Sequence, residues 1–428
     1  MSRFYIWTIG CQMNRADSLK AADELKRRGH VLVGRVEDAG IIVLNTCVVR
    51  QSAENKVIGR LTSLKSLKRG PDRCAIVVMG CFVDDLHSLE QRFPYVDAFL
   101  APSDIDGLVD FVERWDGGGE KVPLEGKADR VPMASLLPIS YGCDHHCTYC
   151  IVTLRRGPER SRPLTELVRE AEELVARGAV EITFLGQNVD SYGHDLPGQP
   201  NLADLLRAIH DIESLQRIRF LTSHPADFRS EITEAVAELP KVCEHFELAV
   251  QAGDDQVLRR MGRGYTVDQF RQLIARIRGR IPDASIATDV IVGFPGESVG
   301  QFEGTVRLIR DVRFDVVHIA AYSPRPGTRS ARWDDDVPAA EKTRRRRLLE
   351  EIQERIAAEI NARLLGQTVE ILVEERNKGK WRGRTRTNKL VFFEADGDWL
   401  GRLVSVEVTW TGPWSMQGKI GSDQSCPV

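Results

Sequence analysis

Short apolar runs alternate with amphipathic helical patterns over the first 115 residues. The apolar runs are FYIWTI (4–9), IIVLN (41–45) and AIVVM (75–79), and helical patterns lie at 18–29 and near 51–69. Strands separated by helices in this way form parallel sheets, because a parallel crossover needs a dozen or more residues. The pattern therefore predicts an N-terminal domain, residues 1–115, built on a small parallel α/β sheet.

A glycine-rich, charged and aperiodic stretch at 116–130 predicts a linker. Six further strand patterns follow it, each with a helical pattern or a long loop behind it: 136–140, 181–185, 217–221, 245–250, 285–292 and 316–322. Repeated βα units build a parallel barrel, and a closed one has eight units. Six units predict an open (β/α)6 arc, which with one long helix at 339–365 makes a central domain over residues 131–365.

The pattern changes to short β runs after residue 366. VEILVEE, KLVFFEA and RLVSVEVTWTG are separated by turns that contain Gly, Asn and Asp. Such a segment is long enough for a small all-β barrel of the OB-like type, which we place at 366–424. The expected fold class is therefore α/β, with a parallel sheet, an open arc and a β-barrel in chain order.

Composition narrows the possible functions only slightly. The 428 residues are 42% hydrophobic and 28% charged, with a net charge of −3, so a nucleic-acid contact would rest on a local basic patch. We expect no membrane association, because no apolar run approaches the ~20 residues that span a bilayer. The N-terminus lacks the pattern of a signal peptide, and nine cysteines in such a chain favour metal ligation in the cytoplasm over disulfides.

Three cysteines form a C-x3-C-x2-C run directly after the strand pattern at 136–140: Cys143, Cys147 and Cys150. Three thiolates can hold three irons of a [4Fe–4S] cube and leave the fourth open to S-adenosylmethionine, which gives a 5′-deoxyadenosyl radical on reduction. Structural zinc is the alternative, but zinc usually takes two pairs of ligands and no second pair lies nearby. We interpret the run as a radical-SAM motif, in which Tyr149 stands where that superfamily often places an aromatic residue near the adenine.

A second set of cysteines shares one local context although its members lie far apart. Cys11, Cys47 and Cys81 each follow a predicted strand by a single residue. Consecutive parallel strands end at the same edge of a sheet, where open α/β folds bind ligands, so we expect the three thiols to converge. Without a fourth ligand they predict a second [4Fe–4S] cluster with an open iron, to which sulfur could bind. Chance is the alternative, because buried cysteine is common.

Polar residues gather at the predicted carboxyl ends of the central strands, where such barrels build active sites. We assign five positions to cofactor binding: Gln187, Asn188, Gln251, Asp289 and Gly293. Gly293 is included because a glycine-rich loop permits close approach of a cofactor. Arg263, in the sequence GRGY, is assigned to the substrate. Ordinary solvated loop residues are the alternative for each.

A basic run without acidic residues lies between residues 376 and 389 of the predicted β-barrel. Six of its members are assigned to RNA binding: Arg376, Lys380, Arg382, Arg384, Arg386 and Lys389. Basic side chains interleaved with Trp381 and Asn388 suit a phosphate backbone. A solvated charged face is the alternative.

Together these motifs resemble the methylthiotransferases of the radical-SAM superfamily, and within them the group that acts on tRNA adenosine. The resemblance runs from about residue 3 to 420 and is carried by GCQMNRADS (10–18), MGC (79–81), YGCDHHCTYCIV (141–152) and YSPRPGT (322–328), among others. GRTRTNKLVFFE (383–394) is similar to the TRAM domain, a small RNA-binding β-barrel. The stretches IVTLRRG and LGQN depart from the usual pattern, which affects only details of cofactor contact.

The resemblance implies two [4Fe–4S] clusters and S-adenosylmethionine, which serves as methyl donor and as radical source. It implies that C2 of N6-(dimethylallyl)adenosine, next to the anticodon, receives a methylthio group whose sulfur was held on the second cluster. The implied partners are the tRNA anticodon stem-loop and a low-potential electron donor such as flavodoxin or ferredoxin. Threonylcarbamoyl-adenosine in tRNA and an aspartate of a ribosomal protein are the alternative substrates. A non-catalytic RNA-binding iron–sulfur protein fits two open-iron clusters less well.

Overall fold

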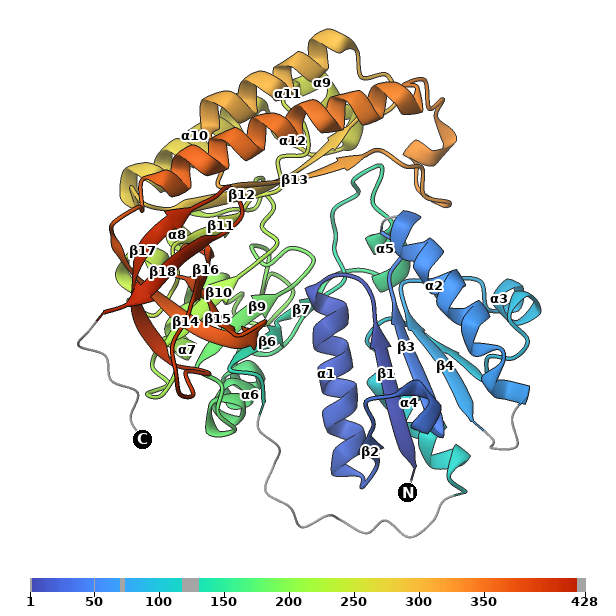
Figure 1. The fold of residues 1–428 in the computed structure, drawn as a ribbon. Helices are drawn as coiled ribbons and strands as arrows, with labels where there is room; N and C mark the ends of the chain where they lie inside the picture. Colours follow the sequence, from blue (N-terminus) through green and yellow to red (C-terminus); the bar gives the residue numbers. More distant parts are fainter. Residues whose placement is uncertain (1, 50, 70–73, 118–130, 422–428) are drawn as a thin grey trace.

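The computed structural model describes residues 2–49, 51–69, 74–117 and 131–421 and contains three units in chain order (Figure 1). The predicted linker at 116–130 lies outside the described residues except for its first two positions, as do residues 422–424 at the predicted end of the β-barrel domain. Among the described helices, none is long and apolar enough to cross a membrane.

The N-terminal domain is a five-stranded, wholly parallel sheet, as the alternation of patterns predicted. Its strands, in spatial order, are β2 (Val31–Leu32), β1 (Arg3–Thr8), β3 (Ile41–Thr46), β4 (Ala75–Gly80) and β5 (Ala98–Leu100). Its helices are α1 (Gln12–Arg27), α2 (Gln51–Leu64), α3 (Leu86–Arg92) and α4 (Ile105–Trp115). One buried apolar cluster joins α1 and α4 to the sheet and another joins α2 and α3, so helices cover both faces. The short edge strands β2 and β5 were not predicted.

The central domain is the predicted open arc of six parallel strands. In order they are β6 (Ala134–Pro138), β9 (Glu181–Leu185), β10 (Arg217–Phe220), β11 (His245–Glu247), β12 (Ser285–Val292) and β13 (Val316–Ala321). They form two three-stranded sheets, and isolated parallel bridges from Ile218 to Val242 and from Ser223 to Leu248 connect the two. A short antiparallel pair, β7 (Ser140–Tyr141) and β8 (Arg160–Ser161), brackets the segment that contains the C-x3-C-x2-C run.

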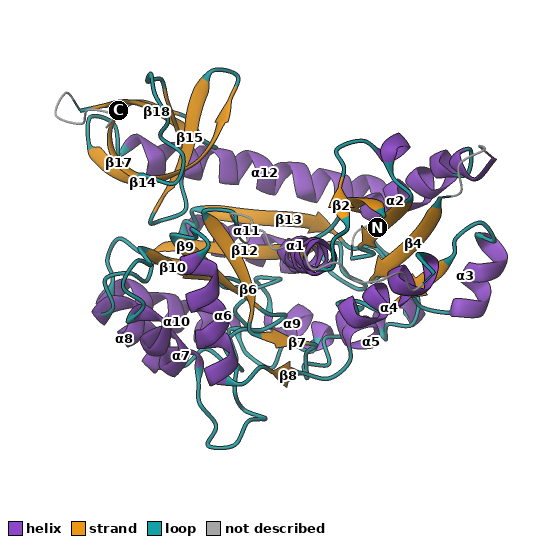
Figure 2. Cartoon of the chain, turned by 90° about the horizontal axis from the view of Figure 1, so that it is seen from below, coloured by secondary structure: helices purple, strands orange, loops and turns teal. Residues whose placement is uncertain are grey.

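Helices form the outer layer of the arc. They are α5 (Val152–Arg156), α6 (Leu164–Ala176), α7 (Leu202–His210), α8 (Ser230–Glu238), α9 (Asp255–Met261), α10 (Val267–Arg280), α11 (Val299–Val312) and α12 (Ala339–Ala362). The long helix predicted at 339–365 is thus α12, which ends three residues earlier. Figure 2 shows α12 beside the arc, with the C-terminal β-barrel at its end.

The C-terminal unit is a closed five-stranded barrel, as predicted for a small all-β domain. Its strands are β14 (Thr368–Asn377), β15 (Lys380–Thr385), β16 (Leu390–Phe393), β17 (Leu403–Thr411) and β18 (Met416–Ile420). Two buried arginines of the arc form hydrogen bonds to the barrel. Arg217 donates to the carbonyl of Arg384 at 2.7 Å, and Arg219 donates to the carbonyls of Thr385 and Arg386, each at 2.7 Å. Because β10 begins at Arg217, the barrel docks at the amino ends of the central strands.

Helix α1 forms part of the contact between the N-terminal domain and the arc. Met13 and Ala16 of α1 are buried in one apolar cluster with Leu185 of β9. Arg177, just after α6, donates to the carboxylate of Asp23 in α1 at 2.9 Å. The carboxyl edge of the N-terminal sheet is thereby brought to the carboxyl ends of the central strands.

Candidate active site

The structure brings Cys11, Cys47 and Cys81, which we call the auxiliary cysteines, to one edge of the N-terminal sheet. Cys11 is the N-cap of α1, and the amide of Cys81 donates to the carbonyl of Thr46 at 3.0 Å. Gly10 permits the close approach, because a Cβ there would lie 2.6 Å from the Cβ of Cys47. Burial raises the pKa of Cys47 to about 11, and the neighbouring thiols of Cys81 and Cys11 raise it further.

Two buried asparagines that the sequence analysis did not single out order this edge. Asn14 donates through Nδ2 to Oδ1 of Asn45 at 2.8 Å and to the carbonyl of Thr46 at 2.9 Å. Asn45 returns a bond to the carbonyl of Asn14 at 2.8 Å. The Cys11 thiol donates to Oδ1 of Asn14 at 3.2 Å. The signal in the sequence is the position of Asn14 three residues after a cysteine N-cap.

The second set, Cys143, Cys147 and Cys150, which we call the loop cysteines, lies between β7 and α5. The amide of Cys150 donates to the carbonyl of Cys147 at 3.1 Å, and the amide of Cys143 to that of Gly157 at 3.2 Å. Burial raises the pKa of Cys143 to about 12 and that of Cys150 to about 11, with contributions from the other thiols of the loop. Iron would have to displace these protons, which is how metal binding couples to thiol ionisation.

Both thiol sets fit a [4Fe–4S] cluster by the chemistry of their donors. Each supplies three sulfur ligands, and clusters of this kind are held by thiolates. Among the described residues, His145, His224 and Asp227 form one group whose ligand atoms lie close enough together to hold a metal ion. The imidazoles of His145 and His224 stack, with ring centroids 3.7 Å apart.

This stacked pair lies beside the loop cysteines and is held by hydrogen bonds. His145 Nε2 is hydrogen-bonded to the Asp227 carboxylate, which also accepts from Nδ2 of Asn188 at 2.5 Å. Burial and the nearby positive charge of Arg263 lower the pKa of His224 to about 2, so this imidazole is neutral. The sequence assigned Asn188 to the cofactor, and in the structure its side chain has a partner within the protein, the carboxylate of Asp227.

The other residues assigned to the cofactor fall into different surroundings. Gln251 has a left-handed backbone, with φ 72°, and its buried Oε1 has no hydrogen-bond partner in the described chain. The backbone amide of Gln251 donates to the backbone carbonyl of Asp289 at 2.8 Å, which brings the main chains of these two assigned residues together. Tyr149 packs edge-on against Phe294, with ring centroids 6.2 Å apart. Gln187 is half-buried just past the end of β9.

The backbone conformation and the packing at position 293 both favour glycine. The φ of Gly293 is 69°, and a Cβ there would lie 2.4 Å from Cγ of Lys342 in α12. Its amide donates to the Glu297 carboxylate at 2.6 Å, which also accepts from Arg345 at 2.7 Å. The glycine therefore serves the packing of α12 against the arc, a reason different from the cofactor approach that the sequence suggested.

Arg263, assigned to the substrate from sequence, is buried against the loop cysteines. Its Nη1 lies 3.5 Å from Sγ of Cys147, its Nη2 donates to the carbonyl of Ala249 at 2.7 Å, and its Nε donates to the Tyr265 hydroxyl at 3.0 Å. Arg263 is thus buried beside the loop cysteines, with hydrogen bonds to groups of the protein itself.

The basic run of the β-barrel divides into two groups. Arg376 is exposed and lies over the Trp381 ring, while Lys380, Arg382 and Arg384 form ion pairs with glutamates of the barrel itself. Arg386 lies 2.6 Å from the Glu244 carboxylate, and Lys389 lies 2.6 Å from that of Asp315. These last two pairs join the barrel to the arc, so Arg386 and Lys389 each have an acidic partner in the other domain.

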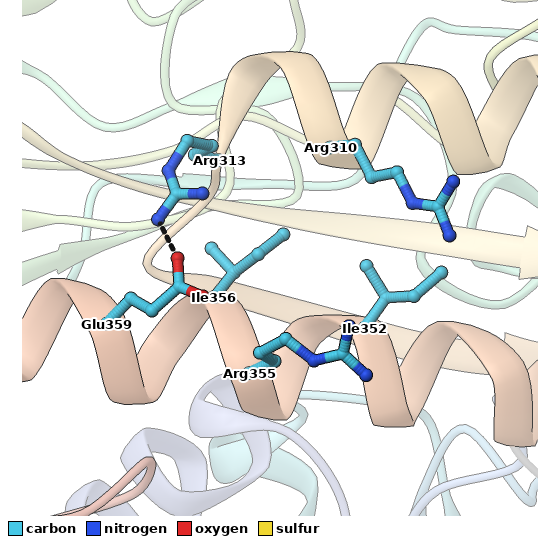
Figure 3. Close-up of a pocket in the computed structure, with 6 residues that line it drawn as sticks. All are labelled: Arg310, Arg313, Ile352, Arg355, Ile356 and Glu359. Carbon is cyan, nitrogen blue, oxygen red and sulfur yellow. Dashed lines mark hydrogen bonds and ion pairs between the residues drawn. The ribbon is translucent and has the colours of Figure 1, made fainter.

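A separate pocket lies on the outer helical layer between α11 and α12. It is lined by Arg310, Arg313, Ile352, Arg355, Ile356 and Glu359, as Figure 3 shows. Arg313 donates to the Glu359 carboxylate at 2.6 Å. The lining of this pocket contains neither set of cysteines, so the candidate site remains the one between the N-terminal domain and the central domain.

Three family models match the chain. The Radical SAM superfamily matches residues 137–309, the Uncharacterized protein family UPF0004 matches 3–101, and the TRAM domain matches 362–420. Among solved structures, the fold is similar to TsrM, a radical S-adenosylmethionine methyltransferase from Kitasatospora setae, with a TM-score of 0.57, 15% identity and 77% of each chain covered. At that identity the likeness shows the fold alone.

Much higher identity links the chain to curated relatives. A protein of Roseiflexus sp. (strain RS-1) is 52% identical over 99% of this chain and 90% of its own length. One of Herpetosiphon aurantiacus is 48% identical over 98% of this chain and 97% of its own length. Both are named tRNA-2-methylthio-N(6)-dimethylallyladenosine synthase.

The arc and its cysteine loop define a radical-SAM enzyme, a class that uses S-adenosylmethionine and a [4Fe–4S] cluster. Within that class, the chain belongs to the family of the tRNA-2-methylthio-N(6)-dimethylallyladenosine synthases.

Proposed function

We propose that this protein adds a methylthio group to C2 of N6-(dimethylallyl)adenosine in tRNA. The observation that carries the proposal is the placement of the two thiol sets on facing domain edges. Ile151, the residue after Cys150, is buried in the same apolar cluster as Cys81 and as Val48, the residue after Cys47. One buried cluster thus joins the segment of the loop cysteines to the edge that would hold sulfur.

The roles of the residues follow from their positions. The loop cysteines would hold one [4Fe–4S] cluster, and the auxiliary cysteines would hold a second. When bound, the two clusters and S-adenosylmethionine supply a carbon-centred radical and a methylated sulfur. The unpaired Oε1 of Gln251 is an acceptor available for the amino group of S-adenosylmethionine, and Asp289 adds negative charge beside it. Arg263, whose Nη1 lies 3.5 Å from Sγ of Cys147, would place a positive charge beside the cluster held by the loop cysteines.

The β-barrel supports a tRNA substrate. Its family model is the TRAM domain, and its exposed hairpin between β14 and β15 presents Arg376, Lys378 and Lys380. The names of the relatives favour dimethylallyladenosine over threonylcarbamoyl-adenosine and over a ribosomal protein. A tRNA substrate implies work in the cytoplasm, with a low-potential donor such as flavodoxin or ferredoxin supplying electrons.

Nucleoside mass spectrometry of tRNA tests the proposal. Cells that lack the gene should lose the 2-methylthio form and accumulate N6-(dimethylallyl)adenosine, and a plasmid copy should restore it. A plasmid copy with Cys47→Ala should not. If the methylthio group disappeared instead from threonylcarbamoyl-adenosine, or from no tRNA nucleoside, the assigned substrate would be wrong.

A further inference from the structure

Two buried arginines of the central domain reach across the domain interface to the auxiliary cysteines. Arg156 ends α5, six residues after Cys150, and Arg325 lies in the loop that follows β13. Their side chains are only 3% and 6% exposed. Each is bonded to residues of the N-terminal domain that lie next to the auxiliary cysteines in space or in sequence.

Arg156 is held by a buried polar pair. Its Nη1 donates to the Ser103 hydroxyl at 3.0 Å and its Nη2 to the Asp17 carboxylate at 3.4 Å. Ser103 in turn donates to Asp17 at 2.8 Å, so the acceptors of the guanidinium are themselves fixed. Burial raises the pKa of the Cys81 thiol, and the nearby positive charge of Arg156 lowers it.

Arg325 contacts the helix that follows Cys47. Its Nη1 donates to Oε1 of Gln51 and to Oε2 of Glu54, both at 3.2 Å, in the first turn of α2, which begins four residues after Cys47. Its Nε is buried and has no hydrogen-bond partner among the residues that the structure describes. Leaving a buried guanidinium N–H unpaired is costly, and Nε of the neighbouring interface residue Arg155 shares this feature.

Charge explains why two arginines should converge here. A [4Fe–4S] cluster with three thiolates and an anionic sulfur ligand concentrates negative charge in a site of low dielectric. Each guanidinium has one carboxylate partner in the N-terminal domain, Asp17 for Arg156 at 3.4 Å and Glu54 for Arg325 at 3.2 Å. Arginine suits the task because its charge is permanent and its planar fork is weakly hydrated.

We propose that Arg156 and Arg325 are positioning residues that form an anion subsite at the auxiliary centre, where hydrosulfide is held at the open iron. This inference rests on the proposed function, because it needs the second cluster. It adds the two residues that retain the anionic sulfur. Since Arg156 follows the loop cysteines on one short helix, it also fixes the auxiliary centre relative to the radical site.

The test uses the full chain with Cys143, Cys147 and Cys150 changed to Ala, so that only the auxiliary cluster remains. Arg156→Gln and Arg325→Gln are made in that background, and Arg155→Gln is the matched control. Arg155 is the preceding residue of α5 and also crosses the interface, but its partner is Asp84, at 2.6 Å. Sodium sulfide is titrated against the electron paramagnetic resonance signal of the reduced cluster, and the midpoint potential is measured.

Arg156→Gln and Arg325→Gln should each weaken hydrosulfide binding at least about tenfold. Each should also make the cluster harder to reduce, and a tenfold change in a one-electron equilibrium is ~59 mV. Arg155→Gln should change neither value. Unchanged binding and potential in both Gln variants, with normal iron content, would overturn the subsite alone. If Arg156→Gln lost its iron, Arg156→Lys would decide: it keeps the positive charge and should retain near wild-type sulfide affinity, and a loss of affinity with normal iron content would overturn the role of that charge. A background that bound no iron would overturn the two-cluster assignment itself.

Discussion

The guanidinium of Arg217, a fully buried side chain, lies 2.8 Å from the carboxylate of Glu370 and joins the central arc to the C-terminal barrel. The same guanidinium donates to the carbonyl of Arg384 at 2.7 Å. Arg217→Met keeps most of the volume but leaves these acceptors without their donor. Each buried group left unpaired costs about 1–3 kcal/mol, so we expect the barrel to undock and its boundary with α12 to become sensitive to protease. Arg376→Ala, on the exposed hairpin, is the control and should leave the protease pattern unchanged. An equally resistant Arg217→Met protein would contradict the docking role.

Iron analysis tests the number of clusters. Anaerobically reconstituted protein should hold about eight irons, as two cubes require. The variant with Ala at all three loop cysteines should hold about four, because the auxiliary cysteines belong to another domain. Cys243→Ala, which removes a buried thiol outside both sets, should keep the full amount. Loss of all iron, or of none, in the triple variant would show that the two sites are not independent.

The auxiliary cysteines should be needed for the product but not for the radical. Cys47→Ala should still cleave S-adenosylmethionine reductively to 5′-deoxyadenosine, since that reaction belongs to the loop cysteines, and should form no methylthio product. Chromatography of both products from one reaction gives the comparison, with Cys74→Ala as a buried-thiol control in the same domain. Methylthiolated adenosine from the Cys47→Ala enzyme would rule out the auxiliary set as sulfur carrier.

The salt dependence of tRNA binding should distinguish the two groups of basic residues. Changing the exposed Arg376 and Lys378 and the half-buried Lys380 to Ala should weaken binding and reduce the slope of log affinity against log salt by roughly two to three units, because fewer phosphates are neutralised and fewer counterions are released. Arg386→Ala should instead lower stability through the lost bond to Glu244 and alter the slope little. Filter-binding titrations at several salt concentrations provide the measurement. Identical slopes for wild type and the triple variant would assign the hairpin to a merely solvated face.

The stability of the metal-free protein should depend on the protonation of Glu247. Burial, together with repulsion from Asp289 on the adjacent strand, raises its pKa from 4.5 to about 7. Between these values the folded protein binds more protons than the unfolded chain, so this group stabilises the fold below pH 4.5 relative to pH 7 and above. The contribution lost as pH rises is at most about 3 kcal/mol. Glu247→Gln should therefore have a flatter dependence of the thermal midpoint on pH between 5 and 7 than wild type. Parallel curves for the two proteins would show that Glu247 is ionised normally.

The three-unit architecture and the division of six cysteines into two sets can be predicted from the sequence alone. Strand and helix patterns are local properties of the chain, so the periodicities at 41–45 or 285–292 predict the elements that form there. The auxiliary cysteines could be grouped because consecutive parallel strands end at one edge, a rule that needs no coordinates. The spacing of the loop cysteines is likewise written in the sequence.

Which side chains meet across long distances in sequence can be seen only in the folded structure. Arg263 and Arg386 look like RNA ligands in a linear reading, yet one is buried beside Cys147 and the other pairs with Glu244, 142 residues away. The pairing of Asn14 with Asn45 depends on how α1 packs on β3 within the N-terminal domain, and the contacts of Arg156 and Arg325 depend on how the two domains face one another. The free energy of a buried charge depends on the partner that compensates it, and that partner is chosen by folding, not by proximity in sequence.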